Sequence, residues 1–417
     1  MTDNDEQNVC EGKPRLRAVE VYSVSLEGEQ LLVLRDPEAL TPEPLILSAV
    51  WGPFLMWMDG SHTPQDMQCN FAEHAEGVIV PVERIEAMIH VLNESLFLDN
   101  PISRDRLSDV ERVFHDSPVR SAKHAGSAYP GDAPELLESI ERLYDDVAMP
   151  TTEHGEAGEL LGILVPHIDP RVGGSVYAKG YMPLLQAPPA DLYVILGVAH
   201  SGGGEYFIAS DKDFETPLGR MSTCREVLGR WEEEAGGSLR VGEVAHRMEH
   251  SIEFQLPFLQ QGLAHEFEIL PVLCGGLEPL LAVGRHPGEV PEVARKLEGL
   301  AVALGSCNRR VQFVVSVDLS HVGPKFGDSA MIQDADAKRV RIADLALLQH
   351  ACDVDPSALF EALRVDQNAR RVDATVALHT FLSLLRKGRG EVVAYDQNRQ
   401  PDSGSMVTYA SMAFRAG

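Results

Sequence analysis

Three histidines occupy the same kind of position in the sequence. His167, His200 and His321 each come at or just after the end of an apolar run of strand length. In open α/β sheets, ligands bind beyond the carboxyl ends of the strands. An imidazole binds metals or transfers protons near neutral pH. Three histidines at one edge of the sheet therefore favour a functional site over three unrelated structural residues. The sequence therefore predicts that these three side chains converge in one pocket.

Carboxylates accompany these histidines. Asp318 precedes His321 by three residues, and it is placed either to orient an imidazole, to accept a proton or to cap the following helix. His250 and Glu253 are also three apart, a spacing that puts both side chains on one face of a helix. Their segment lacks the His-Glu-x-x-His pattern, so a zinc peptidase is not supported. His250, Glu253, Asp318 and His321 are the candidate catalytic residues.

The composition of the chain argues against two classes of binding partner, nucleic acids and membranes. The chain has 417 residues and a formal net charge of −27, which makes it a poor candidate for binding nucleic acid or an anionic membrane. Its amino terminus is polar, and no stretch is long and apolar enough to span a bilayer. The six cysteines are scattered without a Cys-x-x-Cys pair, which argues against a disulfide framework. We expect a soluble cytoplasmic protein.

Beyond residue 120, apolar runs of strand length alternate with helical stretches. The runs are Leu161–His167, Leu192–Val198, Phe267–Cys274 and Phe313–Leu319. This alternation is typical of an α/β domain with a largely parallel central sheet and helices on both faces. Two later strands, Glu391–Asp396 and Met406–Phe414, complete the predicted sheet.

The amino-terminal part of the chain has a different pattern. We predict a disordered tail over 1–14, a small module over 15–100, a polar linker over 101–120 and the α/β domain over 121–417. In the module, Val19–Val24 and Gln30–Leu34 alternate as short strands do. Thr63 is placed to cap a helix over Pro64–His74, and an amphipathic helix follows over Pro81–Leu96. Strands followed by short helices predict a winged-helix-like module.

Residues 121–417 resemble the Memo-like family, called AmmeMemoRadiSam system protein B in bacteria. The resemblance rests on short motifs in family order: His124–Gly131, Val165–Ile168, Leu196–His200, Glu215–Gly219, Glu249–Pro257, Leu270–Leu273, Ser316–His321 and Val407–Phe414. The ordered set is highly specific, although each motif alone is modest. It implies a fold related to the class III extradiol dioxygenases, which use non-haem iron.

The same resemblance implies roles for individual residues. Memo-like pockets are reported to bind metal through two histidines and a cysteine, and the matching histidines here are His167 and His200. Asp318 and His321 match the pocket's Asp and His, and His250 and Glu253 match the helix that flanks it.

The family's cysteine is missing from this chain. Direct alignment puts Arg371 at its position, with Asp373 two residues on. If Asp373 reaches the site, His167, His200 and Asp373 form the two-His-one-carboxylate ligand set of many non-haem iron enzymes. If Arg371 points in instead, the pocket is expected to hold an anion.

Three functions remain open. One is a metal-dependent redox enzyme that uses Fe(II), with His321 as its acid or base. Another is a non-catalytic module that binds a peptide or protein and has lost part of the ancestral metal site. The third is zinc-dependent hydrolysis, with His167, His200 and an acidic residue as ligands and an open position for water. Zinc or no metal are therefore the alternatives to Fe(II). Residues 15–100 resemble the PqqD-like domain through Leu34–Pro37, Leu45–Ser48 and Leu55–Gly60, which implies a peptide or protein partner. The Memo-like resemblance implies a radical SAM protein as one such partner.

Overall fold

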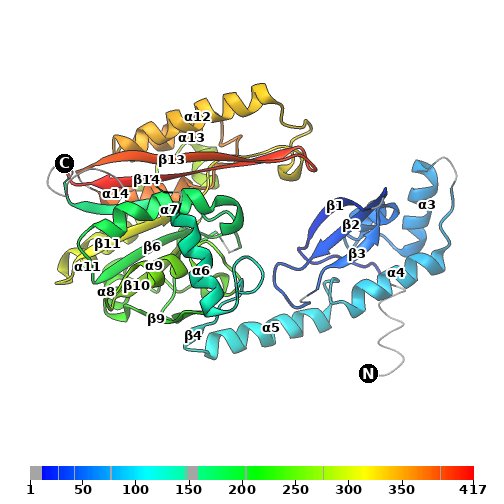
Figure 1. Ribbon diagram of the computed structural model, residues 1–417. Coiled ribbons are helices and arrows are strands. Elements are labelled where there is room, and N and C mark those ends of the chain that lie inside the picture. The colour runs from blue at the N-terminus through cyan, green and yellow to red at the C-terminus, as the bar shows by residue number, and fades with distance from the viewer. Residues whose placement is uncertain are drawn as a thin grey trace. The chain divides into compact units, whose positions relative to one another are not determined.

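The computed structural model describes residues 12–417 except 27, 42, 76–77, 146, 148–157, 202–203, 276 and 386 (Figure 1). The predicted disordered tail over 1–14 therefore lies outside the described residues, apart from 12–14. The chain divides into two compact units, Met1–Asp116 and Ser117–Gly417.

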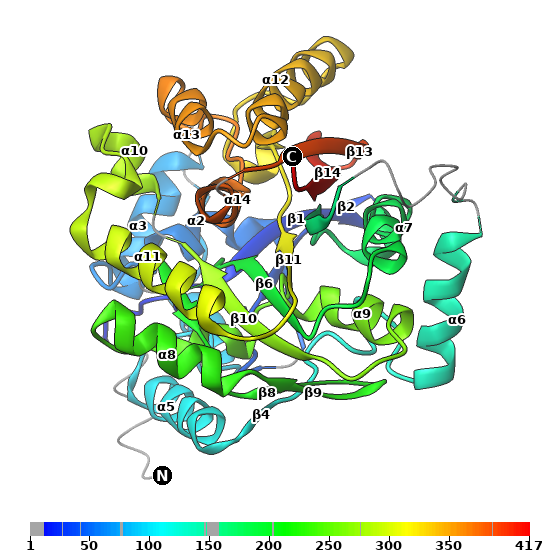
Figure 2. The ribbon, with the colours of Figure 1, turned by 90° about the vertical axis from the view of Figure 1, so that its left-hand side faces the viewer.

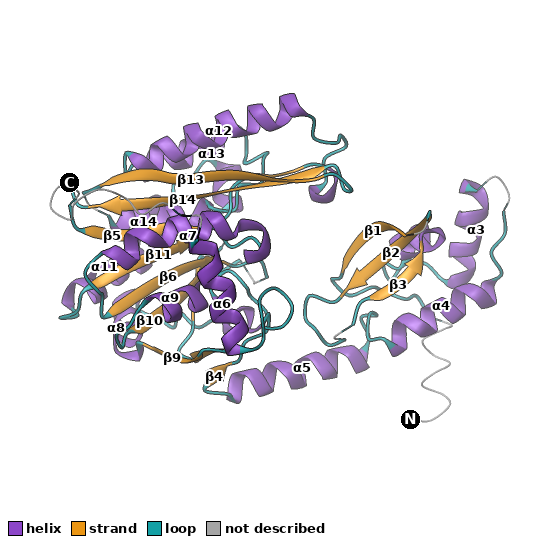
Figure 3. Ribbon diagram, in the orientation of Figure 1, coloured by secondary structure: helices purple, strands orange, loops and turns teal. Residues whose placement is uncertain are grey.

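The smaller unit combines an antiparallel sheet with helices (Figure 3). Its strands, in the order β1-β2-β3, are β1 (Glu20–Leu26), β2 (Glu29–Arg35) and β3 (Leu45–Ser48). Its helices are α2 (Gly52–Trp57), α3 (Pro64–His74), α4 (Val82–Glu94) and α5 (Pro101–Asp116). Thr63 caps α3 in a reciprocal capping box with Asp66, as its position before Pro64 predicts. The segment predicted as a linker is largely helix α5, whose charged residues lie along an exposed helix.

The larger unit is built on one mixed sheet in the order β12-β14-β5-β11-β6-β10-β9-β8-β4, with β13 paired to β14 and β7 to β10. The strands are β4 (Val119–Arg120), β5 (Leu160–Val165), β6 (Leu192–Val198), β7 (Phe207–Ala209), β8 (Asp213–Thr216), β9 (Gly219–Thr223), β10 (Glu268–Cys274), β11 (Val311–Ser316), β12 (His321–Val322), β13 (Arg389–Gln400) and β14 (Ser405–Arg415). Strands β5, β11, β6 and β10 are parallel, and β14 is antiparallel to β5. The predicted, largely parallel sheet is confirmed.

Helices cover both faces of this sheet (Figure 2). They are α6 (Ala133–Tyr144), α7 (Pro170–Gln186), α8 (Arg225–Ala235), α9 (Leu256–Gly262), α10 (Glu278–Val283), α11 (Pro291–Ser306), α12 (Asp334–Cys352), α13 (Pro356–Val365) and α14 (Thr375–Leu384). Short 3-10 turns include η2 (Glu243–Arg247), η3 (Glu253–Gln255), η4 (Pro287–Glu289) and η5 (Pro324–Phe326). Among the described residues, no helix has both the length and the apolar character that crossing a bilayer requires.

The apolar strands are explained by burial on both sides. In β6, Leu192, Val194 and Leu196 pack into one core with α8, α11 and α14. The alternate residues Tyr193 and Ile195 pack into a second core with α6, α7 and α9. Because both faces are covered, a central strand reads as a continuous apolar run and not as an alternation.

We predict that residues 117–417 fold without the smaller unit. The smaller unit has a core of its own, in which Leu34, Phe54 and Ile85 are fully buried, so its removal leaves the cores of the larger unit complete. The truncated chain is expected to stay soluble and to unfold in one cooperative transition, measured by circular dichroism during heating. Aggregation of 117–417, or a broad transition without a baseline, would contradict this independence.

Candidate metal centre

The order of the sheet brings the predicted site residues together. Strand β11 lies between β5 and β6 and is parallel to both, so the carboxyl ends of the three strands meet at one edge. His167 lies just past the end of β5, Asp318 just past β11 and His200 just past β6. This is the edge at which ligands bind in open α/β sheets.

Three imidazoles form a cluster at this edge. The ring centroids of His167 and His200 are 5.0 Å apart. The His250 ring lies 5.2 Å from that of His167 and stacks on His200 at 4.8 Å. The third member of the cluster is therefore His250, where the sequence analysis expected His321.

Asp373 completes the cluster, and Arg371 does not. The Asp373 Oδ2 atom is 3.1 Å from His167 Nε2 and 3.9 Å from His200 Nε2. Arg371 has a left-handed backbone with φ 50°, and its guanidinium donates to Asp328 Oδ1 at 2.7 Å and to the His321 carbonyl at 3.3 Å. Of the two arrangements that the sequence left open, the structure has the one in which the carboxylate faces the histidines.

The hydrogen bonds of the two imidazoles fix which nitrogen faces inward. His167 Nδ1 donates to the Ser316 carbonyl at 3.1 Å, and His200 Nδ1 donates to Glu249 at 3.0 Å. The Nε2 atom of each ring is then the one that faces Asp373, as in metal-binding histidines whose other nitrogen is held by a carbonyl or carboxylate.

Two groups of potential ligands overlap here. Within each of the groups His167-His200-His250 and His167-Asp318-Asp373, the ligand atoms lie within 4.8 Å of one another. Both groups use His167, which has only Nε2 free, and one nitrogen lone pair binds one ion. They therefore describe alternative ligands of a single site and not two sites.

One atom of the pocket is suited to a cation. Asp373 Oδ1 is buried and has no hydrogen-bond partner, although buried polar atoms are almost always paired. A cation bound by the carboxylate and the two Nε2 atoms would satisfy it. The donor set of two imidazoles and one carboxylate fits a divalent transition metal.

The electrostatics of the pocket also favour positive charge. Burial lowers the pKa of His167, but the carboxylates of Asp318 and Asp373 outweigh it and raise that pKa above its usual value. Burial likewise opposes the charged form of His200, yet Glu249 and Asp373 hold its pKa well above normal. Burial of Asp373 is outweighed by His167 and His200, which lower its pKa. The carboxylates thus stabilise a cation here, either protons on the imidazoles or a metal ion.

His250 differs from its two neighbours. Burial, together with the nearby His200 and His167, lowers the pKa of His250 well below its usual value, although Glu249 opposes the shift. Burial raises the pKa of Asp318, despite the opposing charge of His167. Asp318 Oδ1 accepts the backbone N–H groups of His167 and Ile168 at 3.0 and 3.2 Å, so this carboxylate also fixes the backbone beyond β5.

His321 lies beside the cluster. Its Nδ1 donates to the carbonyls of Leu319 and Arg371, at 3.1 Å each, and its ring packs on Phe326 at 5.1 Å. It belongs to neither of the two ligand groups found among the described residues.

Glu249 is a buried member of the site that the sequence analysis did not single out. Its carboxylate accepts the backbone N–H of His200 at 3.0 Å and those of His250 and Ser251 at 2.8 and 2.9 Å, besides His200 Nδ1. It therefore holds the strand end and the His250 loop in one arrangement. Its position next to His250 in the chain was the one available signal.

The His250 loop docks on β6 because Gly197 has no side chain. A Cβ atom at Gly197 would lie 2.6 Å from Ser251 Oγ and 2.9 Å from the Ile252 side chain. The Ser251 hydroxyl occupies that space, donating to the Val198 carbonyl at 3.0 Å and accepting the Val198 N–H at 3.1 Å.

The predicted helix face shared by His250 and Glu253 is not formed. The segment is a turn followed by the 3-10 turn η3, and Glu253 points away from the histidines. Glu253 forms a fully buried ion pair with Arg120, receives the backbone N–H groups of Lys123 and His124, and accepts from Tyr129 Oη at 2.5 Å. These bonds use its carboxylate to anchor residues 120–129, whereas the catalytic role predicted for Glu253 stays a prediction.

This fold and this pocket define an α/β protein with a histidine-carboxylate site at the carboxyl edge of a parallel sheet. The chain belongs to the Memo-like family, because the family model described as Memo-like protein matches residues 120–413. It is 29% identical over 405 residues to a MEMO1 family protein of Aquifex aeolicus, which covers 96% of this chain and 100% of the relative. A MEMO1 family protein of Thermus thermophilus is 29% identical over 343 residues, 81% of this chain and 94% of its own.

The relatives differ in how much of this chain they match. The Aquifex aeolicus match spans nearly the whole chain and so takes in most of the smaller unit. A MEMO1 family protein of Methanosarcina barkeri is 28% identical over 297 residues, which is 70% of this chain but 99% of its own length.

We predict that Glu253→Gln destabilises the protein strongly. Removing one partner of a buried ion pair leaves the other charge unpaired, which costs about 3–5 kcal/mol. Arg120 and Glu253 are 1% and 0% exposed, so solvent does not compensate. The free energy of unfolding is to be measured in urea.

The matched control for this pair is Glu138→Gln, which breaks the exposed Arg142–Glu138 pair on α6. Because both side chains are exposed to solvent, its expected cost is small. Equal effects of the two substitutions would mean that Glu253 is not the structural anchor inferred here.

Proposed function

We propose that the chain is a non-haem, Fe(II)-dependent redox enzyme of the Memo-like family. His167, His200 and Asp373 would hold the metal. The observation that supports this most is Asp373: one of its oxygens faces Nε2 of both histidines, and the other is buried without a partner. When bound, Fe(II) would supply the activation of dioxygen. The reducing cytoplasm is the proposed location, since it preserves free thiols and ferrous iron.

The remaining side chains of the site would position the substrate and handle protons. The His200 side chain is 38% exposed whereas that of His167 is 2% exposed, so substrate would approach from the His200 side. His250, whose ring lies 5.2 Å from that of His167, and His321, beside the cluster, would be the candidate acid-base groups. Asp318 would hold the His167 backbone in place through its two N–H acceptor bonds.

Anaerobic titration with Fe(II) tests this proposal. We expect the wild type to bind one equivalent. His167→Ala and Asp373→Asn each remove an inner ligand, so each should weaken binding by more than the ~10–100-fold that loss of an outer partner costs. Arg371→Cys serves as the control, because the Arg371 guanidinium binds Asp328 and the His321 carbonyl and, among the described residues, has no hydrogen bond to His167, His200 or Asp373.

The outcomes of this titration separate the candidate functions. Unchanged binding in His167→Ala and Asp373→Asn would show that the ligand assignment is wrong. Stronger binding in Arg371→Cys would show that residue 371 reaches the metal after all. Zinc bound in place of iron would redirect the proposal to hydrolysis, for which a zinc-bound water is the usual nucleophile. No metal bound by any variant would favour the second candidate function.

The Glu249 carboxylate should matter for metal affinity without being a ligand. Glu249→Gln places an amide where His200 Nδ1 and three backbone N–H groups need an acceptor. We expect Fe(II) binding to weaken about 10–100-fold, as for other second partners of metal-binding histidines. The nitrogen chemical shifts of His200 should report a change of tautomer.

Glu243→Gln is the control for Glu249. Glu243 also accepts hydrogen bonds in the larger unit, from the Ser210 hydroxyl and the Asp211 N–H, but in the described part of the chain it has no hydrogen bond to a histidine of the cluster. Its substitution should leave Fe(II) affinity unchanged. Equal losses in the two variants would attribute the Glu249 effect to general destabilisation.

The second candidate function is a module that binds a peptide or protein, a radical SAM protein being the partner class that the family suggests. What supports it is the sheet of the smaller unit. Tyr22, Val24 and Leu26 are alternate residues of β1 and therefore lie on one face of the sheet. Tyr22 is paired with Val33 of β2, which is in turn paired with Ile46 of β3. Leu26 is 62% exposed and Ile46 is 58% exposed. An exposed apolar sheet face of this kind is typical of an interaction surface. Such a partner is compatible with either function of the larger unit.

A further inference from the structure

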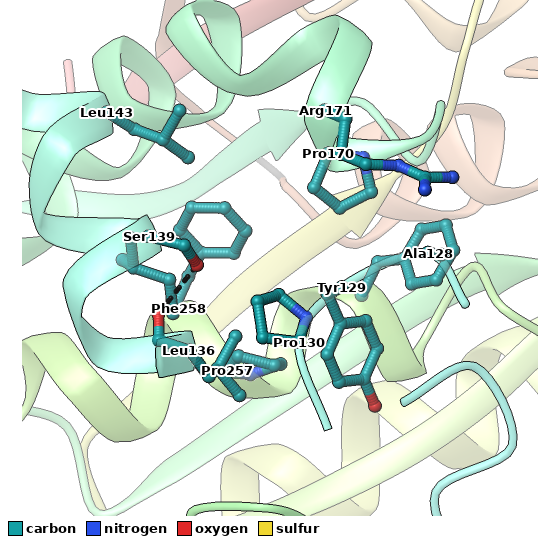
Figure 4. A pocket seen from close by; sticks show the side chains of 12 residues that line it. Ala128, Tyr129, Pro130, Leu136, Ser139, Leu143, Pro170, Arg171, Pro257 and Phe258 are labelled. Atoms are coloured by element: carbon teal, nitrogen blue, oxygen red, sulfur yellow. Dashed lines mark hydrogen bonds between the residues drawn. The ribbon is translucent and has the colours of Figure 1, made fainter. Parts of the chain in front are cut away.

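A cavity of about 230 Å³ lies in the larger unit, bounded by α6, the start of α7 and the η3–α9 segment (Figure 4). Leu136, Ile140 and Leu143 line it from α6. Phe254 and Phe258 line it from the opposite side. The walls are therefore made almost entirely of apolar side chains.

The polar groups on its walls already have partners. Tyr129 Oη donates to Glu253 at 2.5 Å, and the Ser139 hydroxyl donates to the Leu136 carbonyl of its own helix at 2.7 Å. The Arg171 guanidinium at the rim is bound to the Asp169 carboxylate. A ligand with polar groups would lose its hydration here without gaining hydrogen bonds, which is unfavourable.

The walls are also held in place independently of any ligand. Tyr177 and Tyr181 stack on Phe258 with centroid distances of 4.9 and 5.1 Å. The Asp132 side chain caps the start of α6. The lining includes the half-buried Ser139 and Leu143 and the exposed Arg171, so the hollow opens to solvent, and an apolar occupant would remove its apolar wall from water. A preformed, apolar hollow of this size is therefore stabilised by an apolar occupant.

Phe254 separates this cavity from the histidine cluster. Its ring lies 5.2 Å from that of His250 and 5.5 Å from that of His124, and it also lines the cavity. None of His167, His200 and Asp373 lines the cavity. The cavity is thus a second location, next to the candidate metal centre and distinct from it.

We infer that this cavity is a binding site for a small apolar molecule about the size of one aromatic ring with a short alkyl chain. A protein cavity of ~150 Å³ lined by Leu, Ile and Phe binds benzene, so this larger hollow, which is open to solvent on one side, has room for a ring and a few more carbons. Sugars, nucleotides and small carboxylates do not fit this chemistry. The inference does not depend on whether the site beyond Phe254 binds a metal.

Titration of the full-length protein with propylbenzene tests the inference, with benzoate as the charged comparison. We expect a saturable rise in the unfolding temperature with propylbenzene and none with benzoate, since a ligand that binds only the folded state stabilises it. Binding is confirmed by methyl NMR, with contacts expected between the propylbenzene protons and the methyl groups of Leu136 and Ile140.

Two variants fill the cavity and one serves as a matched control. Leu136→Phe adds volume at a cavity wall, whereas Leu137→Phe makes the same change at the neighbouring position on α6, which is 37% exposed. Ser139→Leu is the second filling variant, and it gives up only a hydroxyl bond within its own helix. The filling variants should weaken propylbenzene binding at least tenfold, and Leu137→Phe should bind as the wild type does.

Every outcome of these experiments either supports or overturns the inferred binding site. Absence of saturable binding to the wild type, or equal affinity in Leu136→Phe and Leu137→Phe, would overturn the inference. If neither filling variant folds, the wild-type NMR contacts decide: contacts to Leu136 and Ile140 support the site, and contacts elsewhere or none at all refute it.

Discussion

The insertion of β11 between β5 and β6 is the constraint on which the site depends. Residues 165, 198 and 316 end three strands that are distant in sequence, and parallel pairing alone brings those ends to one edge. A one-residue slip in either pairing would turn the residues beyond that strand end to the opposite face. The apolar cores on both sides of the sheet resist such a slip, because each alternate side chain of β6 belongs to a different core. The packing of the whole larger unit thus fixes the distance between His167 and His200.

Charge balance explains how so many titratable groups lie together. The three imidazoles of the cluster are surrounded by the carboxylates of Glu249, Asp318 and Asp373, two of which are almost fully buried. Unpaired buried carboxylates would be very costly, so their retention requires either positive charge or N–H donors. Glu249 receives N–H donors on every side, Asp318 receives two, and Asp373 relies on the imidazoles alone. Asp373 is therefore the carboxylate most in need of a cation.

The sequence was sufficient to place those site residues that follow the ends of strands. His167, His200 and Asp318 could be placed together because apolar runs locate strands, and parallel strands share an edge. His250 could not be placed in the cluster, since its loop is held by tertiary contacts to β6 and not by helical spacing. The same cause misplaced Glu253, because a 3-10 turn rotates it toward Arg120. The choice between Arg371 and Asp373 depended on a left-handed residue at 371, which an arginine side chain gives no reason to expect.

Gly197 has a consequence for reading other members of the family. The residue carries no functional group and lies within a strand. The Ser251 hydroxyl nevertheless occupies the space beside it, and this contact holds the His250 loop against β6. Even an alanine there would meet Ser251 and Ile252 at less than normal contact distance. The residue at position 197 of a homologous sequence thus indicates whether the same loop arrangement is possible. A homologue that retains both strand-end histidines but has a bulkier residue at this position would have a differently built pocket, even where its histidines align.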